Sequence, residues 1–347
     1  MATKYISKAF KYGLLKQTNW ATVQAAGANF KGVYYTSGSV TNDPGVTVGT
    51  YNASGQYGIQ KEFERVYVDG RSGLARLNFS MLGDVNTLAP HLAAALFATT
   101  EVNSGTYAKV FTAGGLAGTI DFNGDGTELW TLCRKETAAG SNDGVILENC
   151  IIENLNLSWD FLANGTARLL QVSGNWVGNE MNYEQDTSGT WTNSTMQIIG
   201  DADLMSMSTF TVNTVDWSGE NIRSFSFNVA NNVTADSATT AGKVNNYDVS
   251  PVYTSKIILD YNATTEDAMK DFQEGKTIVA TIVSSLGAGT DGYFAIACTG
   301  GILQKPPFIF NGDYAGIELD VLWHSTAGAT PVTINLEDTF DWNFSAP

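Results

Sequence analysis

Two stretches of this chain alternate apolar and polar residues so regularly that they favour β-strands over helices. In ENLNLSWDFLANGTARLLQVSGNW, apolar residues occupy the odd positions from Leu155 to Phe161, and Asn164-Gly165 marks a turn before a second alternating run. A period of two places successive side chains on opposite faces of a strand. The same pattern recurs in RSFSFNV, SKIILDY and GIELDVLW. The sequence therefore predicts a mainly β protein whose strands have one apolar face and one neutral-polar face.

Two segments have the period of a helix instead. NTLAPHLAAALF, residues 86 to 97, repeats leucine at every fourth position, and Asn86 is placed to cap its first turn. TTEDAMKDFQEG, residues 264 to 275, begins with the potential caps Thr264 and Thr265 and ends at Gly275. The chain contains 35 Gly but 7 Pro, a composition that suits many turns between strands. We expect one short helix in each half of the chain.

The two halves share an order of elements. Cys150 to Trp176 and Cys298 to Trp323 each contain a strand, an Asn-Gly turn and a second strand, and each follows a strand-plus-helix unit. We interpret this as a diverged internal duplication, with a chance alignment of strands as the alternative. The predicted organisation is an N-terminal arm over residues 1 to 59, a first module over 60 to 180 with an insertion at about 101 to 147, and a second module over 181 to 347.

Charge is distributed unevenly along the chain. The net charge is −16, yet residues 1 to 59 carry five lysines against Asp43 alone, so this segment is +4 and the remainder is −20. A protein that binds nucleic acid tightly needs an excess of Lys and Arg. This chain has a net negative charge, so specific DNA binding is not expected. The basic segment instead suggests docking onto an acidic neighbouring subunit, with a disordered, solvated tail as the alternative.

The sequence contains no GxxxxGK[ST] phosphate loop, no GxSxG hydrolase motif and no HExxH zinc-protease motif. Cys133, Cys150 and Cys298 are too far apart to form a metal pair, and we expect reduced, buried thiols. His91 and His324 accompany no recognisable nucleophile. The DFNGDG segment at 121 to 126 starts like a calcium loop but has Leu132 where a bidentate Glu is required, which favours a plain turn. We therefore expect no enzyme activity, no cofactor and no metal.

The sequence also gives no sign of secretion or membrane insertion. The first ten residues lack the apolar core of a signal peptide, and no apolar run is long enough to cross a bilayer. We expect synthesis in a cytoplasm, which the family resemblance given next implies to be that of a bacterial host.

The order of hairpin, Leu/Ala-rich helix and long strand pair, followed by RSFSFNVANNV and SKIILDYNATTEDAMKDFQEGKTIVATI, resembles the tail tube proteins of long-tailed, siphovirus-type bacteriophages. The resemblance covers roughly residues 60 to 325. It implies two tandem β-sandwich modules, each with one short flanking helix, and a virion protein that polymerises into the hollow tube that delivers DNA. Six modules form a ring in that family, so this chain would form trimeric, pseudo-hexameric rings that stack.

The resemblance also suggests roles for two groups of residues. The polar faces of the predicted strands would line the lumen, where DNA passes without specific binding: Asn156, Ser158, Asp160, Gln171, Ser173, Asn175, Ser224, Ser226, Asn228, Glu318 and Asp320. The N-terminal arm would dock on the next ring through Lys4, Tyr5, Lys8, Phe10, Lys11 and Lys16, and deletion of residues 2 to 20 would leave a folded monomer. Tape-measure, terminator and tail-tip proteins would be further partners.

Two other classes of protein stay open at this stage. One is another virion component with sheet architecture, such as a tail terminator or a decoration protein. The other is a carbohydrate-binding β-sandwich, in which Trp159, Trp176, Trp217 and Trp323 would stack on sugars. Trp159, Trp176 and Trp323 fall on the apolar faces of their strands, which favours a role in the core.

Overall fold

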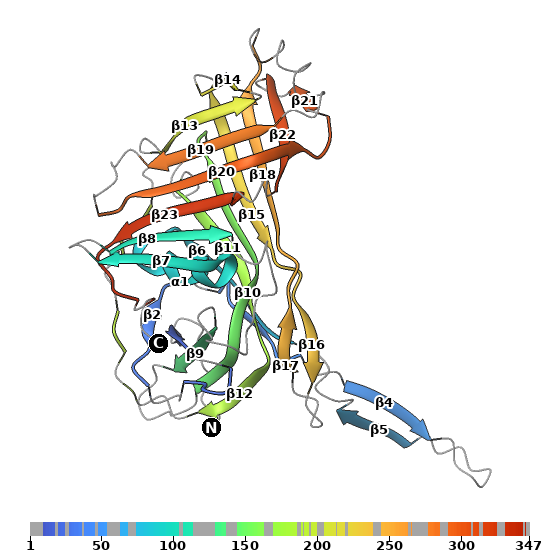
Figure 1. The fold of residues 1–347 in the computed structure, drawn as a ribbon. Helices are drawn as coiled ribbons and strands as arrows, with labels where there is room; N and C mark the ends of the chain where they lie inside the picture. The colour runs from blue at the N-terminus through green and yellow to red at the C-terminus, as the bar shows by residue number, and fades with distance from the viewer. Residues whose placement is uncertain are drawn as a thin grey trace.

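The computed structural model describes most of the chain as antiparallel β-sheet. It describes residues 10–17, 20–24, 28–36, 38–45, 48–53, 63–68, 74–103, 107–113, 129–136, 144–162, 169–185, 189, 191–193, 196–199, 205–212, 214–218, 221–238, 244–262, 265, 277–284, 291–306, 308–311, 315–324, 330–342 and 344. The protein is mainly β, as expected, and the strands of its largest layer run along the length of the molecule (Figure 1).

This first layer is one large antiparallel sheet. Its order is β3 (Thr41–Asp43), β6 (Ala75–Leu82), β11 (Gln171–Gly178), β10 (Gly144–Asp160), β15 (Ile222–Ala230), β18 (Val252–Asp260) and β22 (Ala315–Trp323). The outer edge of β22 pairs with the end of β20 (Phe294–Leu303) and with β21 (Phe308–Asn311). Strands β10, β11, β15, β18 and β22 are the ones that the alternating pattern predicts.

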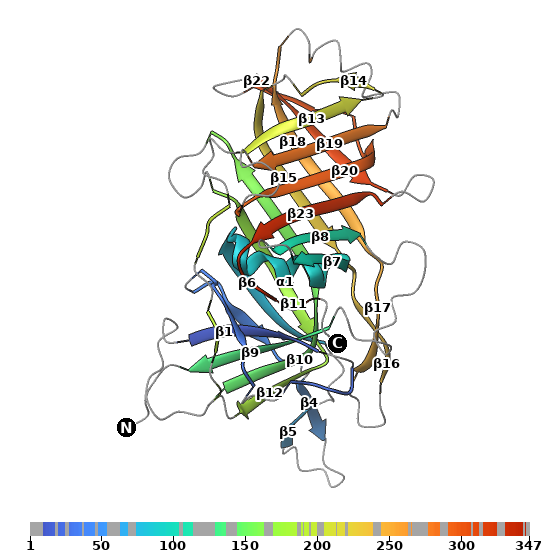
Figure 2. The same cartoon turned by 60° about the vertical axis from the view of Figure 1, so that its left-hand side comes forward.

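A second layer crosses the first. Its order is β14 (Val215–Asp216), β13 (Met205–Val212), β19 (Ile278–Ser284), β20, β23 (Val332–Asp338), β8 (Tyr107–Ala113) and β7 (Phe97–Asn103). Both views show these strands lying across the long strands of the first layer (Figures 1 and 2). The apolar faces of the two layers enclose one continuous core, in which the Trp159 ring contacts Phe225 of its own layer and Phe294 of the other.

A smaller sheet occupies the end near the N-terminus. Its order is β2 (Lys31–Val33), β1 (Phe10–Lys16), β9 (Trp130–Glu136), the first half of β10, and β12 (Glu180–Gln185). Strand β10 belongs to both sheets. Its register shifts between Ile152 and Asn154, and its second half continues into the large sheet. Such a bulge bends a strand and redirects its pairing.

Helix α1 (Val85–Leu96) packs between the layers, and every one of its residues is buried. The sequence predicts this helix correctly to within one residue, but its cap is Asp84 and not Asn86. The Asp84 carboxylate accepts bonds from the Asn86 backbone N–H and the Thr87 hydroxyl, 2.7 Å for the latter. Of the helix predicted over 264 to 275, only Thr265 lies within the described residues, and it is helical.

Two hairpins extend from one end of the body (Figure 1). They are β4 (Val48–Ala53) with β5 (Phe63–Val68), and β16 (Thr234–Ala238) with β17 (Val244–Asp248). Each hairpin follows a strand of the large sheet, β3 or β15, and precedes the strand that pairs with it, β6 or β18.

Part of the predicted N-terminal arm belongs to the body. Strand β1 pairs with β9 from Phe10 to Lys16, and Leu14 is fully buried in the core. The Lys16 ammonium donates to the carbonyl of Phe344, close to the other end of the chain. Residues 1 to 9, with Lys4, Tyr5 and Lys8, lie outside the described residues. Apolar and polar residues show little regular alternation in this region of the sequence. The sequence therefore did not predict that the region contributes a strand to a sheet.

Candidate functional surface

One face of the large sheet carries the polar residues of its strands, and we call it the polar face. All eleven residues predicted to line a lumen lie on it, on β10, β11, β15 and β22. Asp160 and Ser173 are exposed, Asn175 is 9% exposed, and the others are half-buried. The opposite face of the same strands is fully buried, as alternation requires.

The strand register aligns these residues in rows across the sheet. Asn156 faces Ser173 on β11 and Asn228 on β15. The next row joins Gln171, Ser158, Ser226, Lys256 and Asp320. A third joins Asp160, Ser224, Ile258 and Glu318. Segments separated by more than a hundred residues thus form one continuous polar surface.

The cations on the polar face are paired with carboxylates. Arg76 contacts both carboxylate oxygens of Glu153 at 2.9 Å, and this hydrogen bonding lowers the pKa of Glu153. Lys256 lies 2.9 Å from Glu318, and Lys305 pairs with Asp320. Because these charges are neutralised locally, the face presents hydroxyl, amide and carboxylate groups and does not attract phosphates as a basic groove would.

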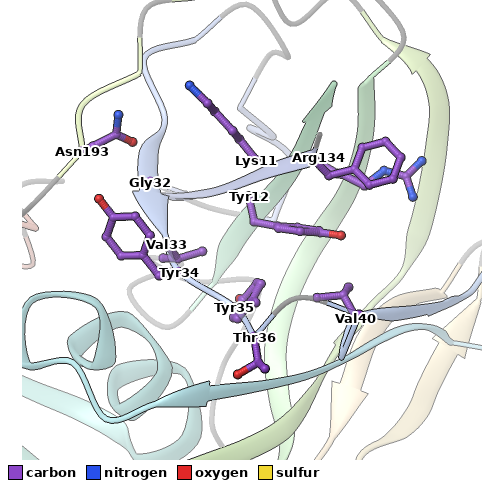
Figure 3. Close-up of a pocket in the computed structure, with 12 residues that line it drawn as sticks. Lys11, Tyr12, Gly32, Val33, Tyr34, Tyr35, Thr36, Val40, Arg134 and Asn193 are labelled. Atoms are coloured by element: carbon purple, nitrogen blue, oxygen red, sulfur yellow. The ribbon is translucent and has the colours of Figure 1, made fainter. Parts of the chain in front are cut away.

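A half-open cavity of about 530 Å³ lies beside the small sheet (Figure 3). Its lining is aromatic and aliphatic with two cations: Phe10, Lys11, Tyr12, Gly32, Val33, Tyr34, Tyr35, Thr36, Gly38, Val40, Arg134 and Asn193. The Arg134 guanidinium stacks over the Phe10 ring at 4.7 Å. None of these lining residues is a carboxylate, a histidine or a cysteine. Two of the residues predicted to dock on the next ring, Phe10 and Lys11, line this cavity.

Other groups singled out in the sequence are in the core. All three cysteines are free and buried, as expected, and burial raises the pKa of the Cys133 thiol to about 12. Trp159, Trp176 and Trp323 are also buried, so they are not available to stack on a sugar. His91 is completely buried in α1. The DFNGDG segment lies outside the described residues.

The described residues contain neither a metal-binding cluster nor a membrane-spanning helix. No group of three or more His, Cys, Asp and Glu side chains is arranged there to hold a metal ion. No helix in the same residues is both long enough and apolar enough to cross a bilayer.

Neither a protein-family model nor a curated protein sequence matches this chain. The proposals below therefore depend on the geometry of the chain and on the resemblance described above.

Proposed function

We propose that this protein is the tail tube subunit of a long-tailed bacteriophage, and that the polar face lines the lumen. The observation that carries this proposal is a single antiparallel sheet, built from both halves of the chain, with one buried face and one polar face whose cations are paired. A surface of this kind lets DNA pass without binding it. The alternatives of a terminator or a decoration protein do not require so extended a polar sheet.

The strand pairings support two tandem modules. The small sheet has the order β2-β1-β9-β10-β12, and the corresponding part of the second layer has the order β14-β13-β19-β20-β23. In the large sheet, the first module contributes strands in the order β3-β6-β11-β10. The second module contributes the order β15-β18-β22, followed by the end of β20 and by β21. The order along the chain also agrees, including the hairpins β4–β5 and β16–β17. We infer modules over residues 10 to 185 and 205 to 338, so the first begins at β1 and not at residue 60.

Local contacts after two equivalent strands agree with this division. Asp84 follows β6 by two residues and accepts from the Thr87 hydroxyl, 2.7 Å. Asn262 follows β18 by two residues, and its side-chain oxygen accepts from the Thr265 backbone N–H, 2.9 Å. Both threonines are fully buried. The same helix-starting device, an Asp or Asn followed three residues later by Thr, thus occurs once in each proposed module.

The junction between the modules suggests how chains would join in a ring. One long edge of β10 pairs with β9 along its first half and with β15 along its second half. The pairing of β10 with β15 is the contact that joins the two proposed modules within the chain. The equivalent edge, formed by the end of β20 and by β21, has no partner among the described strands, and the outer edge of β3 has none either. We propose that this edge of β20 and β21 pairs with β3 of a second copy. Repeating that contact closes a ring of three chains and covers the exposed sheet edges.

Electron microscopy tests the proposal directly. Purified protein should polymerise into hollow filaments of uniform width, and end-on class averages should show three chains and six modules per ring. Six whole chains per ring would contradict the two-module division. A protein that stays monomeric at high concentration, or that binds a glycan array, would contradict the tail tube function.

A further inference from the structure

Three ionisable side chains that play no part in the polar face meet in the core between β7, β8 and β23. Lys109 Nζ lies 2.5 Å from Asp338 Oδ1 and 3.6 Å from Glu101 Oε1. The side chains of Lys109 and Asp338 are 0% exposed and that of Glu101 is 1% exposed. We propose that Lys109 and Asp338 form an intramolecular isopeptide bond, with Glu101 as the base that moves the proton.

The strand register brings the three groups to one face. Glu101 on β7 is directly opposite Lys109 on β8, and Lys109 is opposite Leu336 on β23, two residues before Asp338. Lys109 lies two residues from Phe111, which is fully buried, so its side chain also points into the core. The lysine therefore reaches an acidic partner on each neighbouring strand. The Nζ and the carboxyl carbon are held in contact by the sheet itself, which is the condition for an efficient intramolecular reaction.

Hydrogen bonding leaves the cluster incompletely satisfied as separate ions. Among the described residues, neither carboxylate oxygen of Glu101 has a hydrogen-bond partner, and Asp338 Oδ2 has none. Buried carboxylates without such partners are costly, and removal of two charges by condensation relieves part of that cost. An ordinary buried ion pair would not require a second, unbonded carboxylate beside the same lysine.

The reaction balances without any added reagent. Transfer of one proton from the Lys109 ammonium to the Asp338 carboxylate gives a neutral amine and a neutral acid. Nζ then attacks Cγ of Asp338, Glu101 accepts a proton from the nitrogen and returns it to the departing hydroxyl, and one water leaves. A C–N bond forms, a C–O bond breaks, and no electron is transferred to or from the protein.

The acid is partly in the reactive form near neutral pH. Burial raises the pKa of Asp338 to about 7, although the adjacent Lys109 ammonium acts in the opposite direction. An exposed pair on the same protein provides the contrast. Lys305 and Asp320 also form an ion pair, but the lysine side chain is 53% exposed, so water solvates this pair. We expect no bond there.

Intact mass spectrometry of the folded full-length protein provides the test. The measured mass should be lower than the sequence mass by one water, and proteolysis should yield a branched peptide that joins residues 109 and 338. The denatured wild type should also migrate faster in gel electrophoresis, because the bond joins positions 229 residues apart. The variants K109R and D338A should both have the full sequence mass.

The variant E101Q separates chemistry from packing because its shape is nearly unchanged. It should fold, as judged by circular dichroism, but acquire the bond at least tenfold more slowly than the wild type. Formation at the wild-type rate would overturn the role of Glu101. A folded wild type that keeps its full mass after long incubation at neutral pH, or that loses water only by forming a succinimide elsewhere, would overturn the bond.

Discussion

The hydroxyl of Tyr35 and Nε2 of His91 lie 3.0 Å apart in the core, and this contact fixes the protonation state of the imidazole. Trp176 Nε1 can only donate, and it lies 3.1 Å from the Tyr35 oxygen. The Tyr35 hydroxyl therefore accepts from Trp176, and it donates to His91 Nε2 because burial lowers the pKa of His91 and leaves that nitrogen unprotonated. The Nδ1–H of His91 then donates to the carbonyl of Thr87, 2.9 Å away. The network is complete only with a neutral imidazole.

This network predicts a loss of stability in acid. Burial lowers the pKa of His91 to about 3, whereas an unfolded histidine titrates near 6.5. Between these values the unfolded chain binds the proton and the folded chain does not, so the free energy of unfolding falls as the pH falls through this window. The loss should reach roughly 4 kcal/mol by pH 3. Chemical denaturation at a series of pH values measures it.

Two variants distinguish the imidazole charge from the loss of a contact. H91L should be less stable at neutral pH but should lack this part of the acid slope. Y35F should lose about 1–2 kcal/mol at neutral pH, because His91 Nε2 and Trp176 Nε1 lose their partner, yet it should keep the slope. An unchanged slope in H91L would show that other groups cause the acid sensitivity.

The C-terminal residues 340 to 344 tie several elements together, and their removal should destabilise the fold. Trp342 is 2% exposed and its Nε1 donates to the carbonyl of Asn86, 2.6 Å, while Lys31 donates to the carbonyl of Asp341. W342A should lower the free energy of unfolding by about 3–5 kcal/mol. The control L162A, at a side chain that is 60% exposed, should change it by less than about 0.5 kcal/mol. Equal effects in both variants would contradict the packing assigned to Trp342.

Two deletions at the N-terminus should separate the part of the arm that the fold needs from the part that is proposed to dock on a neighbouring ring. Removal of residues 2 to 20 eliminates β1, including the buried Leu14, so it should prevent stable folding and not leave the folded monomer expected from the sequence. Removal of residues 2 to 9 should preserve the fold and, if Lys4 and Lys8 dock on a neighbouring ring, should shorten the filaments. Thermal melts and micrographs of both variants measure these outcomes. Long tubes from the shorter deletion would contradict the docking role.

The parts of the fold that the sequence predicted are those whose cause is local. Alternation identifies β10, β15 and β22 because each has one buried face, and a leucine repeat identifies α1. The pairing of β1 with β9 joins segments more than a hundred residues apart, so no local period reports it. The meeting of Lys109, Glu101 and Asp338 is equally remote. The only sign of this cluster in the sequence is an inward-facing lysine in YAKVFTA. Its two acidic partners can be identified only from the register of β7 and β23.

Lysines introduced on the polar face should test its proposed role as a lumen lining. Ser173 is exposed and Ser226 is half-buried, and they lie in different rows on β11 and β15. The double variant S173K/S226K should fold with stability within about 1 kcal/mol of the wild type, since neither side chain belongs to the core. It should still form tubes if the polar face has no role in packing the sheets.

The added cations should change the interaction with DNA. Anisotropy of a labelled short duplex should show little binding to the wild type at low salt, because Arg76, Lys256 and Lys305 are already paired with carboxylates. The lysine variant should bind more tightly, with an affinity that falls as salt rises, because each new cation displaces counterions from phosphate. The control S173Q/S226Q adds length without charge and should behave as the wild type does. Strong, salt-sensitive binding by the wild type itself would contradict a face that DNA slides past.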